Sequence, residues 1–167
     1  MSVEVSKIVS GAQTGADRGG LDAAIDLKIP YGGFIPAGRR AEDGRIPSKY
    51  VGLIETRSDG YLVRTRLNAQ NSSATVIFTF GPLSGGSMKT RQFCEEYKKP
   101  WMHVDLRKNV KHTEFLEWLN SIPESKIVLN VAGNRESKSP GIQKETYKFL
   151  MNAFGMVSKM NSVIDKL

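Results

Sequence analysis

Cysteine and histidine are scarce in this sequence, with one Cys (Cys94) and two His (His103 and His112) among 167 residues. A single cysteine excludes a disulfide within the chain. Three such residues are too few for the ligand cluster of a zinc site, so we expect no metal held by the protein itself. Cys94 follows Phe93 in a predicted helix, where we expect it to pack in the interior rather than act as a nucleophile. His103 leaves a predicted strand beside Asp105, and there we expect a structural, hydrogen-bonded histidine.

Long apolar runs are also missing, since no stretch approaches the ~20 residues of a membrane-spanning helix. The first four residues lack the basic and apolar regions of a secretory signal. We therefore expect a cytoplasmic protein without a membrane partner. Acidic residues number 17 against 24 Lys and Arg, which gives a formal net charge of +7. That surplus suits an anionic ligand, although it also fits weak nucleic-acid affinity or an ordinary basic surface. We do not expect nucleic acid to be the partner.

Four short apolar runs are predicted to be strands: residues 3–9, 74–80, 101–104 and 126–131. Segments with apolar residues at helical spacing follow most of them. These helical residues are Leu21, Ala24 and Ile25, then Phe115, Leu116 and Leu119, and finally Ile142, Thr146, Phe149, Leu150 and Ala153. Strands that alternate with helices are typical of an α/β fold, in which helices cover both faces of a mainly parallel sheet. The length suits a single domain, 1–167, and no linker suggests a second one.

Two segments interrupt this alternation. Residues 29–50 contain three prolines and four glycines, which predicts an irregular excursion with a short strand near Tyr31. Long loops in compact domains are more often functional than idle. Residues 58–60, Ser-Asp-Gly, fit either the turn of a hairpin or the start of a helix from Gly60 to about Gln70. We favour the helix, because residues 74–80 then become the next strand of an alternating pattern.

A last helix is predicted at the C-terminus, over residues 156–167. Val157, Met160, Ile164 and Leu167 recur there at helical spacing beyond Gly155. Such an apolar stripe either completes the core of the domain or covers a partner subunit, and in the second case the protein is a homo-oligomer.

The first candidate binding site is the loop after the first strand, Ser-Gly-Ala-Gln-Thr-Gly-Ala-Asp-Arg-Gly at residues 10–19. A glycine-rich turn between a strand and a helix lets backbone amides converge on an anion, and the positive end of the helix dipole adds to the attraction. The spacing matches neither a P-loop nor the dinucleotide-binding fingerprint. The alternative is a structural turn in which Asp17 caps the helix. The candidate ligand-binding residues in this loop are Gly11, Gln13, Thr14, Gly15 and Asp17.

Two further glycine-bearing loops follow predicted strands, at residues 81–90 and 131–135. In a parallel sheet the loops at the carboxyl ends of the strands gather along one edge, where ligands bind. Each loop alone is weak evidence, but three loops that converge favour a phosphate-containing ligand. The candidate residues here are Gly81, Gly85, Gly86, Ser87, Thr90 and Gly133, with the Ser87 and Thr90 hydroxyls as additional donors.

The irregular excursion adds Arg39 and Arg40, in the sequence Pro-Ala-Gly-Arg-Arg-Ala-Glu-Asp-Gly at residues 36–44. Two adjacent guanidinium groups in a glycine-flanked loop suit bidentate contacts with an anion, so both belong to the candidate binding site. In the alternative interpretation the turn is solvated, and Glu42 and Asp43 neutralise the two arginines. Sequence spacing assigns no catalytic role to any of the carboxylates.

Taken in order, these motifs resemble one known family, named putative molybdenum carrier and also described as the circularly permuted YpsA-related branch of the SLOG superfamily. The resemblance runs from about residue 6 to about residue 150, which is nearly the whole domain. The segments that carry it are residues 11–18, 36–44, 55–56, 64–65, Asn68 and 81–87.

The resemblance implies a Rossmann-like three-layer fold, close to that of the lysine-decarboxylase-like, Lonely Guy type proteins. It also implies a ligand at the strand ends: the molybdenum cofactor (molybdopterin) or another nucleotide-like phosphorylated molecule. Lonely Guy phosphoribohydrolases carry the pattern P-G-G-x-G-T-x-x-E. Residues 84–90 keep the paired glycines but lack the following Gly-Thr and the glutamate, which favours binding over nucleotide hydrolysis.

We therefore expect a protein that holds a phosphorylated ligand as cargo on its glycine-rich loops, with the molybdenum cofactor as the main candidate and molybdoenzymes as acceptors. The dithiolene sulfurs of that cofactor bind the molybdenum, which suits a chain with so few metal-ligating residues. Two alternatives stay open. One is an enzyme that hydrolyses the N-glycosidic bond of nucleotides with a carboxylate such as Asp17 or Glu42, and the other is a sensor module for a nucleotide signal.

Overall fold

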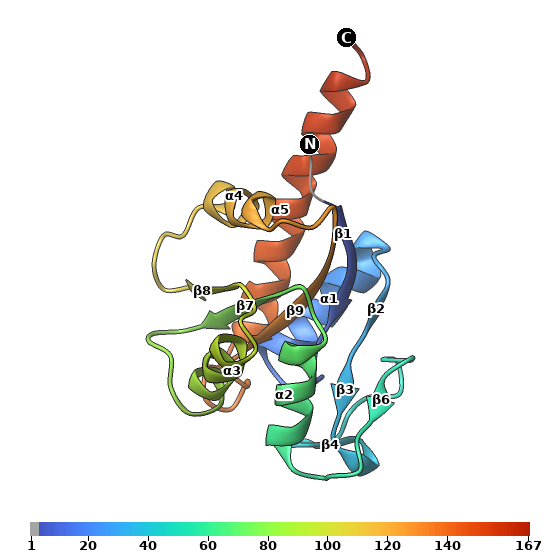
Figure 1. The fold of residues 1–167 in the computed structure, drawn as a ribbon, viewed down its shortest axis with the longest axis vertical. Coiled ribbons are helices and arrows are strands. Elements are labelled where there is room, and N and C mark those ends of the chain that lie inside the picture. The colour runs from blue at the N-terminus through green and yellow to red at the C-terminus, as the bar shows by residue number, and fades with distance from the viewer. Residues whose placement is uncertain (1–3) are drawn as a thin grey trace.

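The central sheet has five parallel strands in the order β2-β1-β9-β7-β8 (Figure 1), in a computed structural model that describes residues 4–167. The strands are β1 (Glu4–Val9), β2 (Tyr31–Gly32), β7 (Ala74–Thr79), β8 (Trp101–Asp105) and β9 (Lys126–Gly133). All four predicted strands are present, and Val3, the predicted first residue of the first strand, lies outside the described residues. The last strand in the chain, β9, lies in the middle of the sheet, between β1 and β7.

Helices cover both faces of this sheet and give the three layers that the sequence predicts (Figure 1). They are α1 (Ala16–Leu27), α2 (Tyr61–Gln70), α3 (Gly85–Glu96), α4 (His112–Ser121) and α5 (Ile142–Ile164). On one face α5 packs against α1 and α4, and on the other face α2 packs against α3. The side chains of β7 alternate accordingly, because Val76 and Phe78 join the core cluster with α1, α4 and α5, whereas Thr75 contacts Cys94 of α3. The predicted single-domain α/β fold is confirmed.

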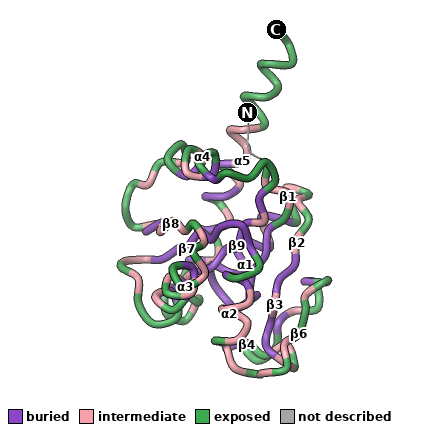
Figure 2. The backbone as a smooth tube through the Cα atoms, viewed as in Figure 1, coloured by how far each residue is buried: buried purple, intermediate pink, exposed green. Residues whose placement is uncertain are grey.

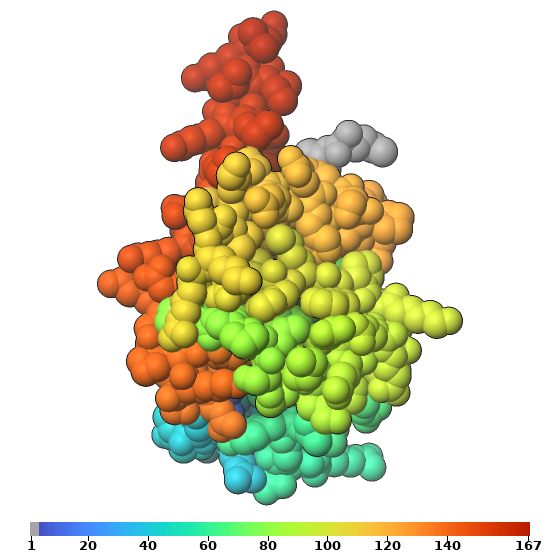
Figure 3. Space-filling model, turned by 90° about the vertical axis from the view of Figure 1, so that its left-hand side faces the viewer, coloured from blue at the N-terminus to red at the C-terminus, as the bar shows by residue number. Residues whose placement is uncertain are grey.

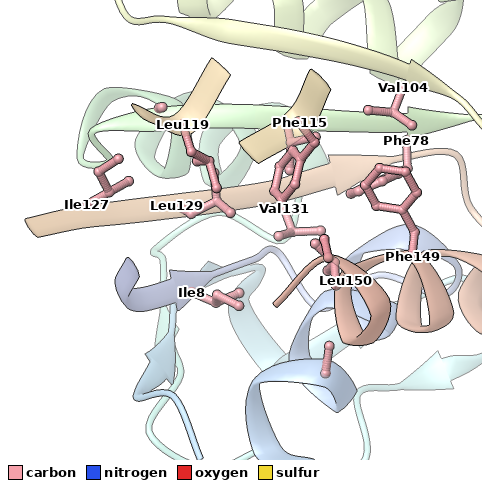
Figure 4. Close-up of a cluster of buried hydrophobic side chains, with 14 of the residues drawn as sticks. Ile8, Phe78, Val104, Phe115, Leu119, Ile127, Leu129, Val131, Phe149 and Leu150 are labelled. Atoms are coloured by element: carbon pink, nitrogen blue, oxygen red, sulfur yellow. The ribbon is translucent and has the colours of Figure 1, made fainter. Parts of the chain in front are cut away.

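The main hydrophobic core lies between the sheet and the three helices α1, α4 and α5 (Figure 4). At one end of it the ring centroid of Phe149 is 5.3 Å from that of Phe78 and 5.6 Å from that of Phe115, and both pairs are edge to face. Such pairs contribute about 0.5–1.5 kcal/mol each beyond the burial of their area. This packing fixes the sheet, and with it the position of the loops that leave its carboxyl edge.

Residues 33–60 form an irregular lobe beside the sheet, as predicted for the excursion. Its short elements are β3 (Phe34–Ile35), η1 (Ala37–Arg39), β4 (Arg40–Ala41), β5 (Gly44–Arg45) and β6 (Ile54–Glu55). β3 pairs with β6 in parallel and β4 pairs with β5 antiparallel. A second small core, which contains Tyr50 and Ile46, joins the lobe to Ala12 and to Leu21 of α1. The predicted short strand at Tyr31 is β2. The helix predicted from Gly60 is α2, so the hairpin alternative is wrong.

The helix α5 continues unbroken through Gly155 to Ile164, where the sequence predicts two separate helices. Glycine costs about 1 kcal/mol in a helix interior relative to alanine, which so long a helix tolerates. Residues 156–167, called here the C-terminal arm, stand away from the rest of the chain (Figures 1 and 3) and are largely exposed (Figure 2). Met160, Ile164 and Leu167 are each more than half exposed, so the arm does not complete the core. The partner-subunit alternative stays a prediction. The described residues contain no helix, α5 included, that is long and apolar enough to cross a membrane.

Candidate anion-binding cleft

Three loops meet at the carboxyl edge of the sheet, because β1, β9 and β7 are parallel neighbours. They are residues 10–15 after β1, residues 80–84 after β7 and residues 134–141 after β9. Backbone hydrogen bonds join them: the Asn134 N–H donates to the Phe78 carbonyl and the Ala16 N–H donates to the Asn134 carbonyl, each at 3.0 Å. The three predicted loops therefore lie together, with the loop after β9 in the middle.

A cleft of about 150 Å³ opens between these loops and α2. Several predicted binding residues line it: Gln13, Asp17, Gly85, Gly86, Ser87, Thr90 and Gly133. The other lining residues are Tyr61, Leu62, Arg64, Thr65, Ser84, Lys89, Ala132, Asn134, Arg135 and Lys138. The remaining predicted residues, which are Gly11, Thr14, Gly15, Gly81, Arg39 and Arg40, lie outside this lining.

Two glycines let the loops approach one another closely. Gly15 has a φ of +85° and Gly133 a φ of +153°, conformations that other residues rarely adopt. A Cβ at Gly15 would overlap the Asn134 carbonyl, and a Cβ at Gly133 would overlap the Phe78 carbonyl. These two glycines therefore build the architecture of the cleft, and any contact of theirs with a ligand stays a prediction.

Three backbone amides of the first loop, those of residues 12–14, already have acceptors within the protein. The Gln13 N–H donates to the Asp17 carboxylate at 3.2 Å, and the Thr14 N–H donates to the side-chain oxygen of Gln13 at 3.1 Å. The Ala12 N–H donates to the Ser10 hydroxyl at 3.0 Å. Asp17 is the second residue of α1 and not its N-cap, so the capping alternative is wrong. These bonds hold the first loop in place, and they leave those three amides unavailable to an anion in the cleft.

Asp17 and Arg64 form a buried ion pair beside the cleft. Asp17 Oδ2 and Arg64 Nη1 are 3.4 Å apart, and the side chains are only 5% and 12% exposed. Burial raises the pKa of Asp17, and the positive charge of Arg64 opposes that rise. The Arg64 guanidinium lies 5.7 Å from the ring centroid of Tyr61 and fills the space that a Cβ at Gly11 would need. A side chain at Gly11 would therefore have to displace the Arg64 guanidinium.

Two acidic residues of the lobe fasten it to the loops and to α1, by long-range contacts that the sequence does not reveal. The Glu42 carboxylate accepts hydrogen bonds from the Thr14 hydroxyl and from the N–H and hydroxyl of Ser137, the last two at 3.2 and 2.6 Å. Asp43 accepts two hydrogen bonds from Arg18, at 2.6 and 2.9 Å. Burial opposes ionisation of Glu42, but the hydrogen bonds from Ser137 and Thr14 outweigh it and lower the pKa. The contacts with Arg18 lower the pKa of Asp43.

Arg39 has a role inside the lobe. Its guanidinium donates three hydrogen bonds to backbone carbonyls, those of Ile46, Pro47 and Tyr50, at 3.3, 2.9 and 2.9 Å. These bonds tie the turn after η1 to the segment around Tyr50. Arg39 would have to give them up to reach a ligand in the cleft, so its predicted contact with an anion finds no support in its position.

Arg40 lies at the border of the cleft. Its guanidinium carbon is 5.5 Å from the ring centroid of Tyr61, which lines the cleft, and its Nη1 is 3.4 Å from the exposed carboxylate of Asp59. The alternative in which Glu42 and Asp43 neutralise the adjacent arginines is wrong, because those carboxylates bind partners outside the turn.

The first turn of α3 lines the cleft with Gly85, Gly86 and Ser87. The first amides of an α-helix have no acceptor inside the helix, and this end of the helix carries a partial positive charge. The Ser87 hydroxyl accepts from the Ser84 N–H at 2.9 Å and donates to the Ser84 carbonyl at 2.8 Å, which fixes the turn. The Lys138 ammonium donates to the Ser84 hydroxyl from the loop after β9. These features make the start of α3 the part of the cleft best suited to an anion.

The side chains that line the cleft carry an excess of positive charge. Four are cationic, Arg64, Lys89, Arg135 and Lys138, and one is a carboxylate, that of Asp17. Such a surplus in a hollow favours an anionic ligand. The candidate set from the sequence did not include these four cations. The signal that could have found Lys89, Arg135 and Lys138 is their position within or directly after two of the glycine-bearing loops.

Several other residues named from the sequence have structural surroundings. Cys94 is buried, and burial raises the pKa of its thiol. His103 Nε2 lies 2.6 Å from the Thr79 hydroxyl, and burial lowers the pKa of its ring. The Gly81 N–H donates to the Asp105 carboxylate at 2.9 Å, beside this histidine. Within residues 4–167, no three His, Cys, Asp or Glu side chains form a group that could hold a metal ion.

The sequence matches the profile of the circularly permutated YpsA SLOG family over residues 8–154. The protein belongs to this family. The chain is also 43% identical to a protein from Syntrophus aciditrophicus SB that is described as a putative molybdenum carrier protein, and its fold matches the crystal structure of that protein with a TM-score of 0.85. That match covers 92% of this chain and 97% of the other. The comparison with curated proteins gives no match.

The match confirms the family that the sequence motifs resemble. The SLOG region, residues 8–154, includes the three loops, the lobe and the first half of α5. The C-terminal arm lies beyond it. The cleft is therefore built by the part of the chain that matches the family. The C-terminal arm is not part of that match.

Proposed function

We propose that this SLOG protein binds a phosphorylated small molecule in the cleft and carries it, with the molybdenum cofactor as the cargo. The observation that carries the proposal is the group of cationic side chains around the first turn of α3. A phosphate group there would receive hydrogen bonds from the amides of Gly85 and Gly86, because the Ser87 N–H already donates to the Ser84 carbonyl. It would also receive charge-assisted contacts from Lys89, Arg135 and Lys138. The name of the related protein from Syntrophus aciditrophicus, a putative molybdenum carrier protein, supports this choice of cargo.

The molybdenum cofactor suits this cleft because its phosphate belongs to an organic molecule that binds its own metal through dithiolene sulfurs. The protein then needs phosphate-binding groups and no metal ligands. A carrier must also release its cargo to an acceptor, for which molybdoenzymes are the natural class. Lys89, Arg135 and Lys138 are exposed, so solvent screens their charges and the affinity for the cargo should be moderate.

The state of the carboxylates supports binding rather than hydrolysis. A general acid or base must come within hydrogen-bond reach of the bond that reacts. Asp17, the carboxylate in the lining of the cleft, is buried and paired with Arg64. Glu42 is occupied by hydrogen bonds from Thr14 and Ser137. These partners speak against the role that the N-glycosidic hydrolase alternative gives to either carboxylate.

Native mass spectrometry of protein purified without oxygen tests the cargo. We expect the co-purifying molecule to contain one organic phosphate and one molybdenum atom. Elemental analysis for phosphorus and molybdenum checks this composition. A bound nucleotide without molybdenum would contradict the cargo but not the anion site. Incubation with nucleoside monophosphates would complete the test, because release of free base would overturn carriage in favour of hydrolysis.

Paired substitutions test the site itself. A buried hydrogen bond to a charged group contributes about 1.5–3 kcal/mol. Lys89 and Lys138 are exposed, so each should contribute to the binding free energy at or below the lower end of that range. We expect the double substitution Lys89→Ala and Lys138→Ala to weaken binding of GMP about tenfold or more in calorimetry. Lys159→Ala with Lys166→Ala removes the same charge from the exposed C-terminal arm and should change the affinity less than twofold. Equal losses in the two variants would mean that net charge, and not the cleft, attracts the ligand.

A further inference from the structure

The C-terminal arm carries an apolar stripe that the rest of residues 4–167 leaves largely uncovered. With roughly 100° between successive helical residues, the apolar side chains of the arm fall within an arc of about 120°. Four of them are more than half exposed. The stripe continues the face that α5 buries in the core as far as Ala153, beyond the point where the core ends. Exposed apolar faces of this kind mark interaction sites. The apolar residues of the arm are Met156, Val157, Met160, Val163, Ile164 and Leu167.

A second apolar surface lies at the other end of α5, where α1, β2 and the lobe form an open groove of about 1190 Å³. Ile25 and Val51 line it with side chains that are 39% and 62% exposed. Ile29, Pro30 and Tyr31 continue its apolar lining. None of the residues that line this groove lines the anion-binding cleft. The groove is therefore a separate surface, and its exposed apolar side chains have no partner in the cleft.

The arm cannot enter the groove of its own chain. Gln143 and Tyr147, in the first two turns of α5, line the groove, and the arm is the far end of the same unbroken helix (Figure 1). At 1.5 Å per residue, Met160 lies roughly 20 Å beyond Tyr147 along the helix axis. An apolar stripe and an apolar groove that cannot meet within one chain can still meet between two copies, as in the exchange of an element between protomers.

We infer that two copies of this chain associate by exchanging their arms, so that each arm lays its apolar stripe in the groove of the other copy. This association goes beyond the proposed function and does not depend on the cargo. A helix that places residues i, i+3, i+4 and i+7 in a groove is a common mode of recognition. The exchange makes the contact twice, which doubles the buried area toward the roughly 1,200 Å² of a small stable interface. We expect a weak dimer, with a Kd of tens of micromolar.

The charges of the groove suit the arm better than those of the cleft do. The polar face of the arm carries Lys159, Asp165 and Lys166, a net charge of +1. In the groove three carboxylates balance three ammonium groups, whereas the cleft has four cations and one carboxylate and would repel the arm. Asp26 of the groove is exposed and accepts a hydrogen bond from the Tyr147 hydroxyl at 2.6 Å. Its carboxylate forms no ion pair within residues 4–167, so it can pair with a lysine of the arm.

Two other partners for the arm fit these residues less well. Helices that lie on a membrane surface are rich in Lys and Arg on the polar face and carry aromatic residues on the apolar face, but the arm has two lysines and no aromatic residue. In an antiparallel pair of two arms, Lys159 and Lys166 lie on the same flank of the stripe and would face the same lysines of the other arm. The groove avoids this repulsion.

Sedimentation velocity over a range of about 5 to 200 µM protein tests the exchange. We expect the wild type to be monomeric at the lowest concentration and largely dimeric at the highest. Met160→Ser with Ile164→Ser removes apolar surface from the arm, and Ile25→Ser with Val51→Ser removes it from the groove. Each double substitution should leave the protein monomeric throughout. Circular dichroism at the lowest concentration checks that both variants fold, and removal of residues 156–167 gives a second test of the arm.

Ile54→Ser is the matched control, because Ile54 is 56% exposed but lies outside the groove. Monomeric arm and groove variants, together with a control that still dimerises, support the inference. A wild type that stays monomeric, or a dimer that survives the substitutions in the groove, would overturn it, and the second result would mean that the arms pair with each other. Flotation with phosphatidylserine vesicles tests the membrane, and binding by a wild type that does not dimerise would also overturn the exchange. Calorimetry with GMP tests the proposed function separately, so that either proposal can fail alone.

Discussion

The ion pair between Arg18 and Asp43 is one of the two carboxylate contacts that fasten the lobe, and the effect of its removal on stability can be worked out. The Arg18 side chain is 6% exposed and that of Asp43 is 46% exposed, and two hydrogen bonds of 2.6 and 2.9 Å join them. Asp43→Asn keeps the shape but leaves a buried guanidinium without its counter-ion. Hydrogen bonds to charged groups contribute about 1.5–3 kcal/mol each, and solvent screening at the half-exposed carboxylate reduces the total loss to about 2 kcal/mol. In a domain of this length that corresponds to a fall in Tm of roughly 4–8 °C.

Thermal denaturation followed by circular dichroism at neutral pH measures this fall. The matched control is Asp59→Asn, since the Asp59 side chain is 75% exposed and its ion pair with Arg40 spans 3.4 Å. Exposed pairs of that kind contribute little, so we expect its free energy of unfolding to change by less than about 0.5 kcal/mol. If Asp43→Asn lowers Tm no more than Asp59→Asn does, the lobe is not held by this carboxylate and the reasoning is refuted.

The ion pair between Arg18 and Asp43 also predicts how the difference in Tm between the wild type and Asp43→Asn depends on pH. Arg18 lowers the pKa of Asp43 in the folded protein, so the pair stabilises the fold above the pKa of the unfolded chain, about 3.9. That stabilisation is lost as the pH falls through the lower pKa of the folded state. The difference in Tm between the wild type and Asp43→Asn should therefore be largest near neutral pH and shrink in acid. A difference that persists undiminished below pH ~2 would mean that the substitution acts through shape rather than charge.

Two further substitutions and one truncation probe other features. Gly133→Ala should lower the free energy of unfolding by more than about 3 kcal/mol or prevent soluble expression, because its Cβ would overlap the Phe78 carbonyl. The Cβ of Gly86→Ala meets no atom within 4 Å, so this variant should leave Tm unchanged or slightly higher in the same melting experiment. Similar losses of stability in both variants would contradict the close approach at Gly133. Removal of the C-terminal arm, residues 156–167, should shift Tm by less than about 2 °C and leave GMP affinity unchanged, since its apolar side chains from Met160 onward are exposed. A collapse of stability would place the arm in the core after all.

Local patterns were sufficient to predict the strands and the loops of the site. Residues 74–79 are fully buried, and residues 126–131 are buried apart from exposed Lys126 and half-buried Val128. Glycines follow both runs where the chain turns into helices or loops. Such signals depend on neighbouring residues, so they can be recognised without the fold. For the same reason the sequence could predict α2, which begins directly after Gly60.

Contacts between distant residues could not be predicted in this way. Ser137 and Glu42 are 95 residues apart in the chain, and nothing near either one indicates the other. Arg39 and Arg40 look equivalent in the sequence, yet one guanidinium turns inward to three carbonyls of the lobe while the other borders the cleft at Tyr61. The direction of a side chain in an irregular turn depends on backbone angles that only the packed lobe determines.

The insertion of β9 between β1 and β7 has a consequence for how the chain folds. During synthesis the segments of β1, β2, β7 and β8 all emerge before β9. Until β9 arrives, β1 and β7 each have an unpaired apolar edge, which is a hazard for aggregation. The closing step is non-local, because β9 must pair with a strand that was made more than a hundred residues earlier, and such steps are slow. The middle loop of the cleft follows β9, so a nascent chain forms the cleft only when the sheet is completed.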